Sequence, residues 1–366
     1  MKKIISFIIP MFFYLLLFSN ECIIPFSING KIGFINEKMS LLTEAQYIGR
    51  VVSFNEEMVM VYCKSYDVII GKNGEQLTRG VDTLLIVDND KYVISQEGGS
   101  YFSRLFSSEK KVLKVFDKIK IIDTDHNGHL MIVDGTDNSS SRYNIINLNG
   151  DLLYKNNTFK RIFDYNSEKK VAFVQDNDFN DCLVDSAGET INKVPFQFGM
   201  RSMSEGFVFG KNLKTGECGF YDMECKLVVK AGVKNGSTMD DWNCYPGISC
   251  GVIALVNDGE KNVLLSEWQT LHSDNWSIVD SSGHFLEYGI TADKIYSFSD
   301  DVAVLMLQEG KKTIYRLINK NGKIITDRDF DQINSSVNGY CMAEKDGVDY
   351  LIKSKDGSVY RCLDFK

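Results

Sequence analysis

A calcium-binding pattern is present between residues 123 and 134. Asp123, Asp125 and Asn127 alternate along the chain ahead of Gly128, and Asp134 follows six residues after that glycine. Calcium prefers about six to eight oxygen ligands, and this spacing lets one turn wrap around the ion. Glu is usual at the last position, however, and the flanks IKII and LMIV indicate strands instead of helices. The pattern leaves two interpretations, a calcium site and an ordinary hairpin turn with Asx side chains.

Two other patterns are compatible with hydrolytic chemistry. Residues 247–251 read GISCG, the spacing of a nucleophilic serine elbow, but VIALV follows where that motif needs a helix. Each of the adjacent carboxylate pairs at 240–241 and 300–301 could supply the acid and the base of a glycosidase. Neighbouring acidic residues in loops are ordinarily just solvated. The sequence therefore favours a protein without catalysis and keeps an enzyme as the alternative.

All three tryptophans lie in or beside one long interval of the chain, residues 237–276. Trp276 falls in a position that a strand core would use. Trp242, Tyr245 and Trp268 lie in segments without strand patterning, and insertions in repeat proteins tend to form loops on one face, often the binding face. We expect these three aromatic side chains to contact a sugar or a peptide partner. The alternative is that they pack within the loop or around a disulfide.

The chain has nine cysteines. If Cys22 is lipidated or free, the remaining eight are compatible with disulfide bonds in an oxidising compartment. Cys244 and Cys250 lie six residues apart in a loop and are the expected disulfide pair. The alternative is that most cysteines are small buried apolar residues. The sequence has no Cys-x-x-Cys and only four histidines, which argues against structural zinc. No cofactor is expected, apart from calcium in the loop described above.

The N-terminus has the pattern of an export signal. Lys2 and Lys3 precede the apolar run 4–18, and polar residues follow it. A basic tip followed by 15 apolar residues is typical of a secretory signal and short for a membrane span. We therefore assign residues 1–22 to a signal peptide or a lipoprotein signal, with Cys22 as the lipidated residue in the second case. Glu21 is unusual before a lipidated cysteine. An uncleaved anchor helix or a buried strand is the alternative.

Composition limits the partners. The chain has 366 residues, with 41 Lys and Arg against 49 Asp and Glu, and a formal net charge of −8. Nucleic-acid binding depends on neutralising phosphates, and no basic stripe is present. We expect no nucleic-acid partner, and membrane contact only through the signal or a lipid anchor. Periplasm, outer surface and secretion outside the cell all remain open.

One short sequence pattern recurs along the chain and predicts the architecture. A turn position occupied by Gly in six copies recurs every 35–40 residues, with one interval of 58. A tight hairpin turn favours Gly there because positive φ is costly for residues with a Cβ. The nine positions are Met39, Gly74, Lys110, Gly150, Gly188, Cys225, Gly283, Gly322 and Gly357.

Each repeat contains about four short strands. An apolar run precedes each turn and another follows it, as in KIIT at 323–326. A second apolar run, such as VAVLML at 302–307, lies about halfway to the next turn and follows an FSxG-like step. No segment shows sustained helical periodicity, so helix should be minor.

These units resemble the bacterial WG-repeat proteins (KWG-type), whose units follow K-W-G-F-I-D-x-x-G-K and later F-S-E-G-L-A-x-V. KIGFINEKM (31–39), ECGFYDMECK (217–226) and NWSIVDSSGH (275–284) match the first half, and FSDDVAVL (298–305) matches the second. The resemblance covers residues 29–366, although no copy contains Trp-Gly itself. It implies an architecture of repeated β-units much more than a particular chemistry.

A single four-stranded unit cannot bury both faces of its sheet, so neighbouring units must cover it. We predict an all-β fold, a β-propeller-like array of about eight four-stranded repeats of 35–40 residues, with an open β-solenoid as the alternative. The domain should span residues 23–366, with a loop insertion at about 232–275. The C-terminal segment 349–363 is expected to supply strands that close the ring near residues 31–46.

Fold does not decide function. We expect an exported repeat scaffold that binds a protein, peptide or glycan partner at the cell envelope or outside the cell, through loops on one face and without catalysis. The alternative is a glycan-active hydrolase or lyase with carboxylates in the central channel. An envelope spacer without a specific ligand is a third reading.

Overall fold

A computed structural model describes residues 22–54, 57–80, 83–96, 102–134, 142–155, 159–191, 196–198, 205–233, 247–257, 261–265 and 269–365. Within these ranges, no helix is both long enough and apolar enough to cross a membrane. The predicted signal segment, residues 4–18, lies outside them.

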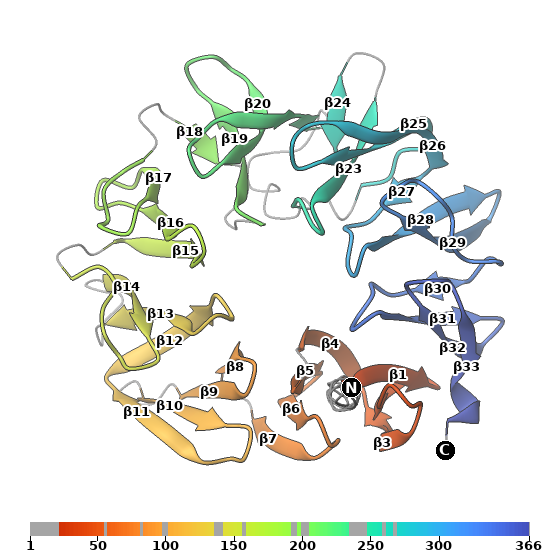
Figure 1. Cartoon of the computed structure of the whole chain (residues 1–366), viewed down its shortest axis with the longest axis horizontal. Coiled ribbons are helices and arrows are strands. Elements are labelled where there is room, and N and C mark those ends of the chain that lie inside the picture. The colour runs from red at the N-terminus through yellow and green to blue at the C-terminus, as the bar shows by residue number, and fades with distance from the viewer. Residues whose placement is uncertain are drawn as a thin grey trace, which may run out of the picture.

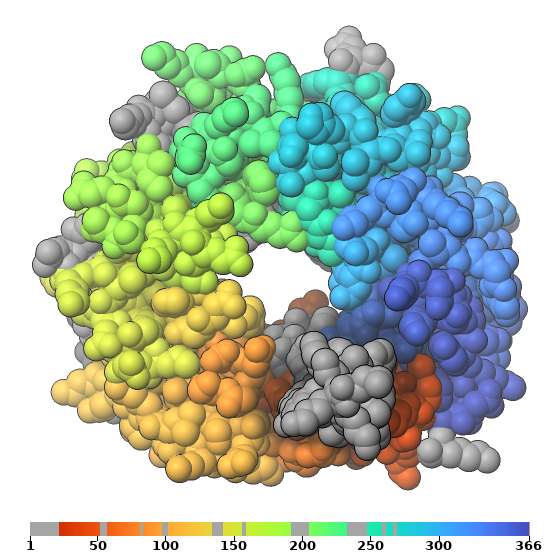
Figure 2. Space-filling model, viewed as in Figure 1, coloured from red at the N-terminus to blue at the C-terminus, as the bar shows by residue number. Residues whose placement is uncertain are grey.

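The described strands form nine small sheets, which follow one another around a ring (Figure 1). The space-filling view shows an opening through the middle of the ring (Figure 2). Within each sheet, consecutive strands pair antiparallel, with the exception of the parallel pair β22 and β24. The predicted all-β, propeller-like fold is therefore confirmed, with the 3-10 element η2 as the one helical element among the residues named above.

The first three sheets contain the strands nearest the N-terminus. Their strands are β1 (Ile24–Ile28), β2 (Lys31–Ile35) and β3 (Leu41–Tyr47); β4 (Gly49–Phe54), β5 (Met58–Cys63), β6 (Asp67–Gly71) and β7 (Gln76–Gly80); and β8 (Thr83–Asp88), β9 (Lys91–Gln96), β10 (Phe102–Ser107) and β11 (Val112–Asp117).

The next three sheets continue around the ring. Their strands are β12 (Ile119–Thr124), β13 (His129–Asp134) and β14 (Arg142–Asn147); β15 (Arg161–Asn166), β16 (Val171–Gln175) and β17 (Asp181–Val184); and β18 (Phe196–Phe198), β19 (Phe207–Asn212), β20 (Cys218–Asp222) and β21 (Leu227–Lys230).

The last three sheets bring the chain back to its starting point. Their strands are β22 (Gly232–Val233), β23 (Val252–Asn257), β24 (Asn262–Leu264), β25 (Ser273–Asp280) and β26 (Phe285–Ala292); β27 (Lys294–Ile295), β28 (Val302–Glu309) and β29 (Lys312–Asn319); and β30 (Gln332–Ile333), β31 (Tyr340–Lys345), β32 (Val348–Lys353) and β33 (Val359–Arg361), followed by η2 (Cys362–Asp364).

The number of sheets differs from the expected eight. We expected residues 349–363 to close the ring near residues 31–46, and these segments do pack together, but β1–β3 and β30–β33 each form a sheet of their own. Each of the nine recurring turn positions therefore belongs to a separate sheet. The two end sheets pack together through an apolar cluster that includes Phe26, Leu351 and Cys362, all buried. The ring thus closes by packing, with no strand pairing between the end sheets among the described residues.

The recurring turns adopt the predicted backbone conformation at all nine positions. Six are glycines with φ between 74° and 86°, and Met39, Lys110 and Cys225 have φ of 59°, 64° and 62°. In most copies an Asx side chain three residues earlier accepts two backbone N–H groups. Asp280 Oδ1, for example, accepts from Ser282 N at 2.8 Å and His284 N at 2.9 Å. This contact explains why Asn or Asp so often precedes the turn.

The FSxG-like steps form a second set of turns, which make hydrogen bonds with a neighbouring sheet. The central residues of the 300–301 turn both have positive φ, as a two-residue hairpin requires. Asp300 Oδ2 accepts from Gly339 N of the next sheet at 2.8 Å. In the same way, the Glu205 carboxylate accepts from Cys250 N at 2.6 Å and from the N–H of the following glycine at 2.7 Å.

The predicted insertion lies in the seventh sheet. Within residues 232–275, the described part contains β22, β23, β24 and the start of β25, and together with β26 these strands form a five-stranded sheet. Trp276, in β25, is buried, and its Nε1 donates to Ala292 O at 2.9 Å. It is a core residue, as its place in the repeat predicts.

Candidate functional site

The predicted calcium loop is a hairpin turn between β12 and β13. Asp125 Oδ1 accepts from Asn127 N at 2.8 Å and from His129 N at 2.9 Å, while Oδ2 lies 2.9 Å from His129 Nδ1. Asp123 Oδ1 accepts from Thr124 N at 2.9 Å. Both carboxylates thus hold the turn together.

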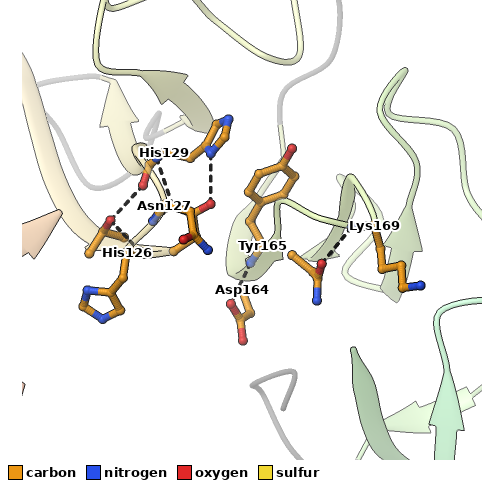
Figure 3. Close-up of polar contacts among 9 residues, drawn as sticks. His126, Asn127, His129, Asp164, Tyr165 and Lys169 are labelled. Atoms are coloured by element: carbon orange, nitrogen blue, oxygen red, sulfur yellow. Dashed lines mark hydrogen bonds and ion pairs between the residues drawn. The ribbon is translucent and has the colours of Figure 1, made fainter. Parts of the chain in front are cut away.

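Figure 3 shows the surroundings of this turn. The His129 ring meets the edge of the Tyr165 ring of the next sheet, with 5.1 Å between centroids. On the other side, His126 Nδ1 lies 2.6 Å from Ile86 O of the preceding sheet. The turn therefore joins three consecutive sheets. No three His, Cys, Asp or Glu side chains in the described part of the chain gather as a metal-binding group. The side chain of Asp134 lies outside that part, so calcium stays a prediction.

The carboxylate pair at 300–301 also has structural contacts. Asp300 Oδ2 accepts from Gly339 N and from Ser336 Oγ, each at 2.8 Å. Asp301 forms an ion pair with Lys320 Nζ at 2.7 Å. The pair at 240–241 lies outside the described residues.

The serine of the GISCG segment is likewise part of a turn. Ser249 Oγ donates to Phe298 O of the following sheet at 2.6 Å, and β23 follows where a nucleophile elbow requires a helix. Cys250, at the tip of the turn, is half-buried. Its predicted disulfide partner Cys244, and the predicted ligand-binding residues Trp242, Tyr245 and Trp268, all lie outside the described residues. The disulfide and the aromatic contacts remain predictions.

Cys22 is the first described residue of the chain. It is half-buried, and its Sγ lies 3.2 Å from Glu37 Oε1, at the turn between β2 and β3. Lipidation at this residue also remains a prediction.

A cavity of about 670 Å³ lies where the two ends of the chain meet, and we call it the seam pocket. Four sheets line it. The first contributes Ser27, the second Arg50, the eighth Tyr296, and the ninth Asp331 and Glu344. This volume accommodates a small organic ligand or a few residues of a peptide.

The pocket lies beside the first sheet, which differs from the other three-stranded sheets. In the fourth, fifth and eighth sheets the outer strand is reduced to isolated bridges such as Ile318 with Ile324. In the first sheet, the recurring turn at Met39 joins β2 and β3, which makes them the third and fourth strands of the repeat and β1 the second. The first, inner strand of this repeat therefore has no counterpart among the described residues. The pocket is bordered instead by β4 and β30, which begin the second and ninth sheets.

Two carboxylates of the pocket contact the ends of the ring. Asp349 accepts from Ser27 Oγ at 2.6 Å and from Asn29 N at 2.8 Å, which ties the ninth sheet to the first. Asp331 accepts from Asp346 N at 2.6 Å, and Lys312 Nζ lies 3.4 Å away. The hydrogen bond from Asp346 N lowers the pKa of Asp331, so its carboxyl is ionised at neutral pH.

Sequence reasoning did not identify any residue of the seam pocket. Ser27 and Asp349 are separated by 322 positions, and only ring closure brings them together. The sequence did predict that residues 349–363 lie near residues 31–46, where the pocket is found, but it did not predict a binding site there.

Comparison with known proteins agrees with the repeat architecture. Residues 315–348 match the family model described as WG containing repeat, which supports a WG-repeat family. No curated protein matches the sequence.

Solved structures of other proteins show similarity to this chain. A crystal structure of the eukaryotic initiation factor is similar over 94% of this chain and 96% of that chain, with a TM-score of 0.50 and 9% identity. Apo AztD from Citrobacter koseri gives a TM-score of 0.40 at 10% identity, over 83% of this chain and 92% of that one. Dihydro-heme d1 dehydrogenase NirN in complex with DHE gives 0.42 at 12%, over 88% and 76%. At such identities the likeness concerns the fold alone.

Proposed function

We propose that this chain is an exported repeat scaffold of the bacterial WG-repeat (KWG) type, which binds a protein, peptide or glycan partner and catalyses no reaction. The observation that carries the proposal is that the described carboxylates suspected of calcium binding or of catalysis make structural contacts. Asp125, Asp300 and Asp301 all hold turns or join neighbouring sheets. A rigid ring whose polar residues are committed to its own turns is suited to present loops and a pocket to a partner.

The contact surface proposed from the sequence is the insertion of the seventh sheet. Replacing both Trp242 and Trp268 by Ala should abolish capture of the partner, because truncation of an aromatic anchor commonly costs about 2 kcal/mol or more. Stability should hardly change, because loops outside the repeat contribute little to the stacked core. The measurement is a pull-down of the mature chain against envelope and host-surface material, together with a glycan array.

A matched control uses exposed aromatic residues outside the insertion, one on the fifth sheet and one on β26 of the seventh. Phe179 and Tyr288 are 68% and 75% exposed, and their double Ala variant should bind as the wild type does. Undiminished capture by the double Trp variant would remove the insertion from the interface, and outright unfolding would place those tryptophans in the core. N-terminal sequencing of the mature protein tests export, since an intact Met1 in cytosolic protein contradicts it.

The alternative function, a glycan-active hydrolase or lyase, draws on Asp331, Glu344 and Asp349 in the seam pocket. A general acid at neutral pH needs a raised pKa, whereas the pKa of Asp331 is lowered by its hydrogen bond from Asp346 N. Incubation with a glycan library separates the two assignments. Cleaved products that disappear in a Glu344→Gln variant would favour the enzyme over the scaffold.

A further inference from the structure

The seam pocket carries more negative than positive charge. Its lining contains three carboxylates, Asp331, Glu344 and Asp349, and one guanidinium, that of Arg50. Lys312 offsets the charge of Asp331, with 3.4 Å between Nζ and Oδ1. The two hydrogen bonds that Asp349 accepts come from neutral groups and leave its charge in place.

Glu344 is the carboxylate most available to a ligand. Its side chain is exposed, and among the described residues it makes no ion pair and no side-chain hydrogen bond. It sits on β31, opposite Asp349 of β32 in the ladder, so two carboxylate-bearing residues are paired neighbours across these strands. Like charges placed this way are unfavourable unless a cation or solvent lies between them.

The aromatic lining suits a cation as well. Tyr296 and Tyr315 of the eighth sheet line the pocket. Lys294 Nζ lies 4.8 Å from the centroid of the Tyr296 ring, so this ring already contacts one ammonium group of the chain itself. The Tyr296 hydroxyl already has a partner, because it donates to Met306 Sδ at 3.9 Å, which leaves the face of the ring as the part offered to a cation. Aromatic faces and carboxylates together are the groups that recognise organic ammonium ions.

We propose that the seam pocket binds an amine-bearing organic cation, which bridges the first and ninth sheets. The proposal rests on the binding role proposed above and adds the ligand class and the site. Its ammonium group would contact Glu344 and Asp349 of the ninth sheet, and its aliphatic part would lie against Tyr296 and Tyr315 of the eighth. The lining residues Ser27 and Ile32 would supply its contacts with the first sheet. The chain's formal charge of −8 would attract such a ligand from a distance.

The position of the pocket links binding to closure of the ring. Every other pair of neighbouring sheets is joined by the chain itself, but the first and ninth are joined by packing and by contacts such as Asp349 with Ser27. A ligand that touches both sheets binds the closed ring and not the open one. By linkage, it must stabilise closure.

Two probes separate the sources of such a cation. Spermidine represents a free polyamine, and the blocked tripeptide acetyl-Ala-Lys-Ala-amide represents a lysine side chain. Calorimetry on the full mature chain should show saturable binding of at least one probe, with a matching rise in melting temperature. The tighter probe identifies the source, and the tripeptide with acetylated lysine should not bind.

A charge-matched pair of variants locates the site. Glu344→Gln should weaken binding roughly tenfold or more, because a charge-assisted hydrogen bond is lost. Glu189→Gln removes the same charge on the fifth sheet and should leave affinity unchanged. Absence of binding by both probes, or equal weakening by the two variants, overturns the proposal. Capture of a partner on the glycan array without probe binding would overturn this inference and leave the proposed scaffold function intact.

Discussion

At the scale of single residues, the turn position of each repeat explains the scatter of glycine along the chain. Gly283 has φ of 86°, and a Cβ placed on it would lie 2.5 Å from Val228 O of the neighbouring sheet. The residue is therefore required by its backbone conformation and by close approach of another strand. Lys110 holds the equivalent position with φ of 64°, and its Nζ donates to Gln76 O of the preceding sheet at 2.9 Å. That cross-sheet contact accompanies the strained conformation.

The two requirements on Gly283 can be separated by mutation. Gly310 has φ of 63° and nothing within 4 Å of a built Cβ. Gly310→Ala should lower the free energy of unfolding by on the order of 1 kcal/mol, because only the left-handed backbone conformation is unfavourable there. Gly283→Ala should cost more, because its methyl group also meets a backbone carbonyl. Urea unfolding followed by fluorescence measures both. Equal losses for the two variants would show that sheet contact adds nothing.

At the scale of the repeat unit, the Asx side chain before the turn gives the fold a dependence on acid. The hydrogen bond from His284 N is the largest cause that lowers the pKa of Asp280 below its ordinary value of 3.8. A carboxylate whose folded pKa is depressed contributes stability that is complete above the unfolded value and is lost as pH falls through the folded value. Asp88, Asp176, Asp331 and Asp356 have lowered pKa values as well. The ring should therefore lose stability as pH falls below about 4.

Asp280→Asn tests this dependence without removing the turn. Asn36, Asn147 and Asn319 hold the same position in other copies, and their amide oxygens accept the same pair of N–H groups. The variant should keep the fold at neutral pH, and its free energy of unfolding should fall less steeply between pH 5 and pH 2.5. A slope identical to that of the wild type would mean that this carboxylate is not linked to folding.

The repeat unit is also the scale at which sequence predicts best. The turn register was predicted correctly at all nine positions, even where Met39, Lys110 and Cys225 replace Gly, because spacing alone placed them. The sequence predicted about eight units without fixing the exact number, since strand periodicity does not show whether the two end copies share a sheet. The seam pocket could not be predicted, because its lining depends on contacts between residues more than 300 positions apart.

At the scale of the whole molecule, the ring has one junction that the chain does not cross. Asp349 is a principal polar link there, since it accepts from Ser27 Oγ and Asn29 N, while Asn338 Nδ2 donates to Ile23 O at 2.8 Å. Phe26 and Phe365 add an edge-to-face contact with 5.5 Å between centroids. No strand pairing joins any two of the nine sheets among the described residues, but every other junction is also crossed by the chain. Opening at this one junction should therefore require less free energy than separating any other pair of sheets.

Asp349→Ala should therefore destabilise the junction selectively. Two hydrogen bonds to a charged acceptor are lost, which costs about 1.5–3 kcal/mol for each in typical cases and less at a half-exposed site. Hydrogen exchange read by mass spectrometry should show faster exchange in β1–β3 and β30–β33, with β12–β17 across the ring unchanged. Asp274→Ala is the control, because Asp274 Oδ1 accepts from Thr291 Oγ1 within a single sheet, at 2.7 Å. Uniformly faster exchange around the whole ring would show that the junction does not open by itself and that the nine sheets unfold as one cooperative unit.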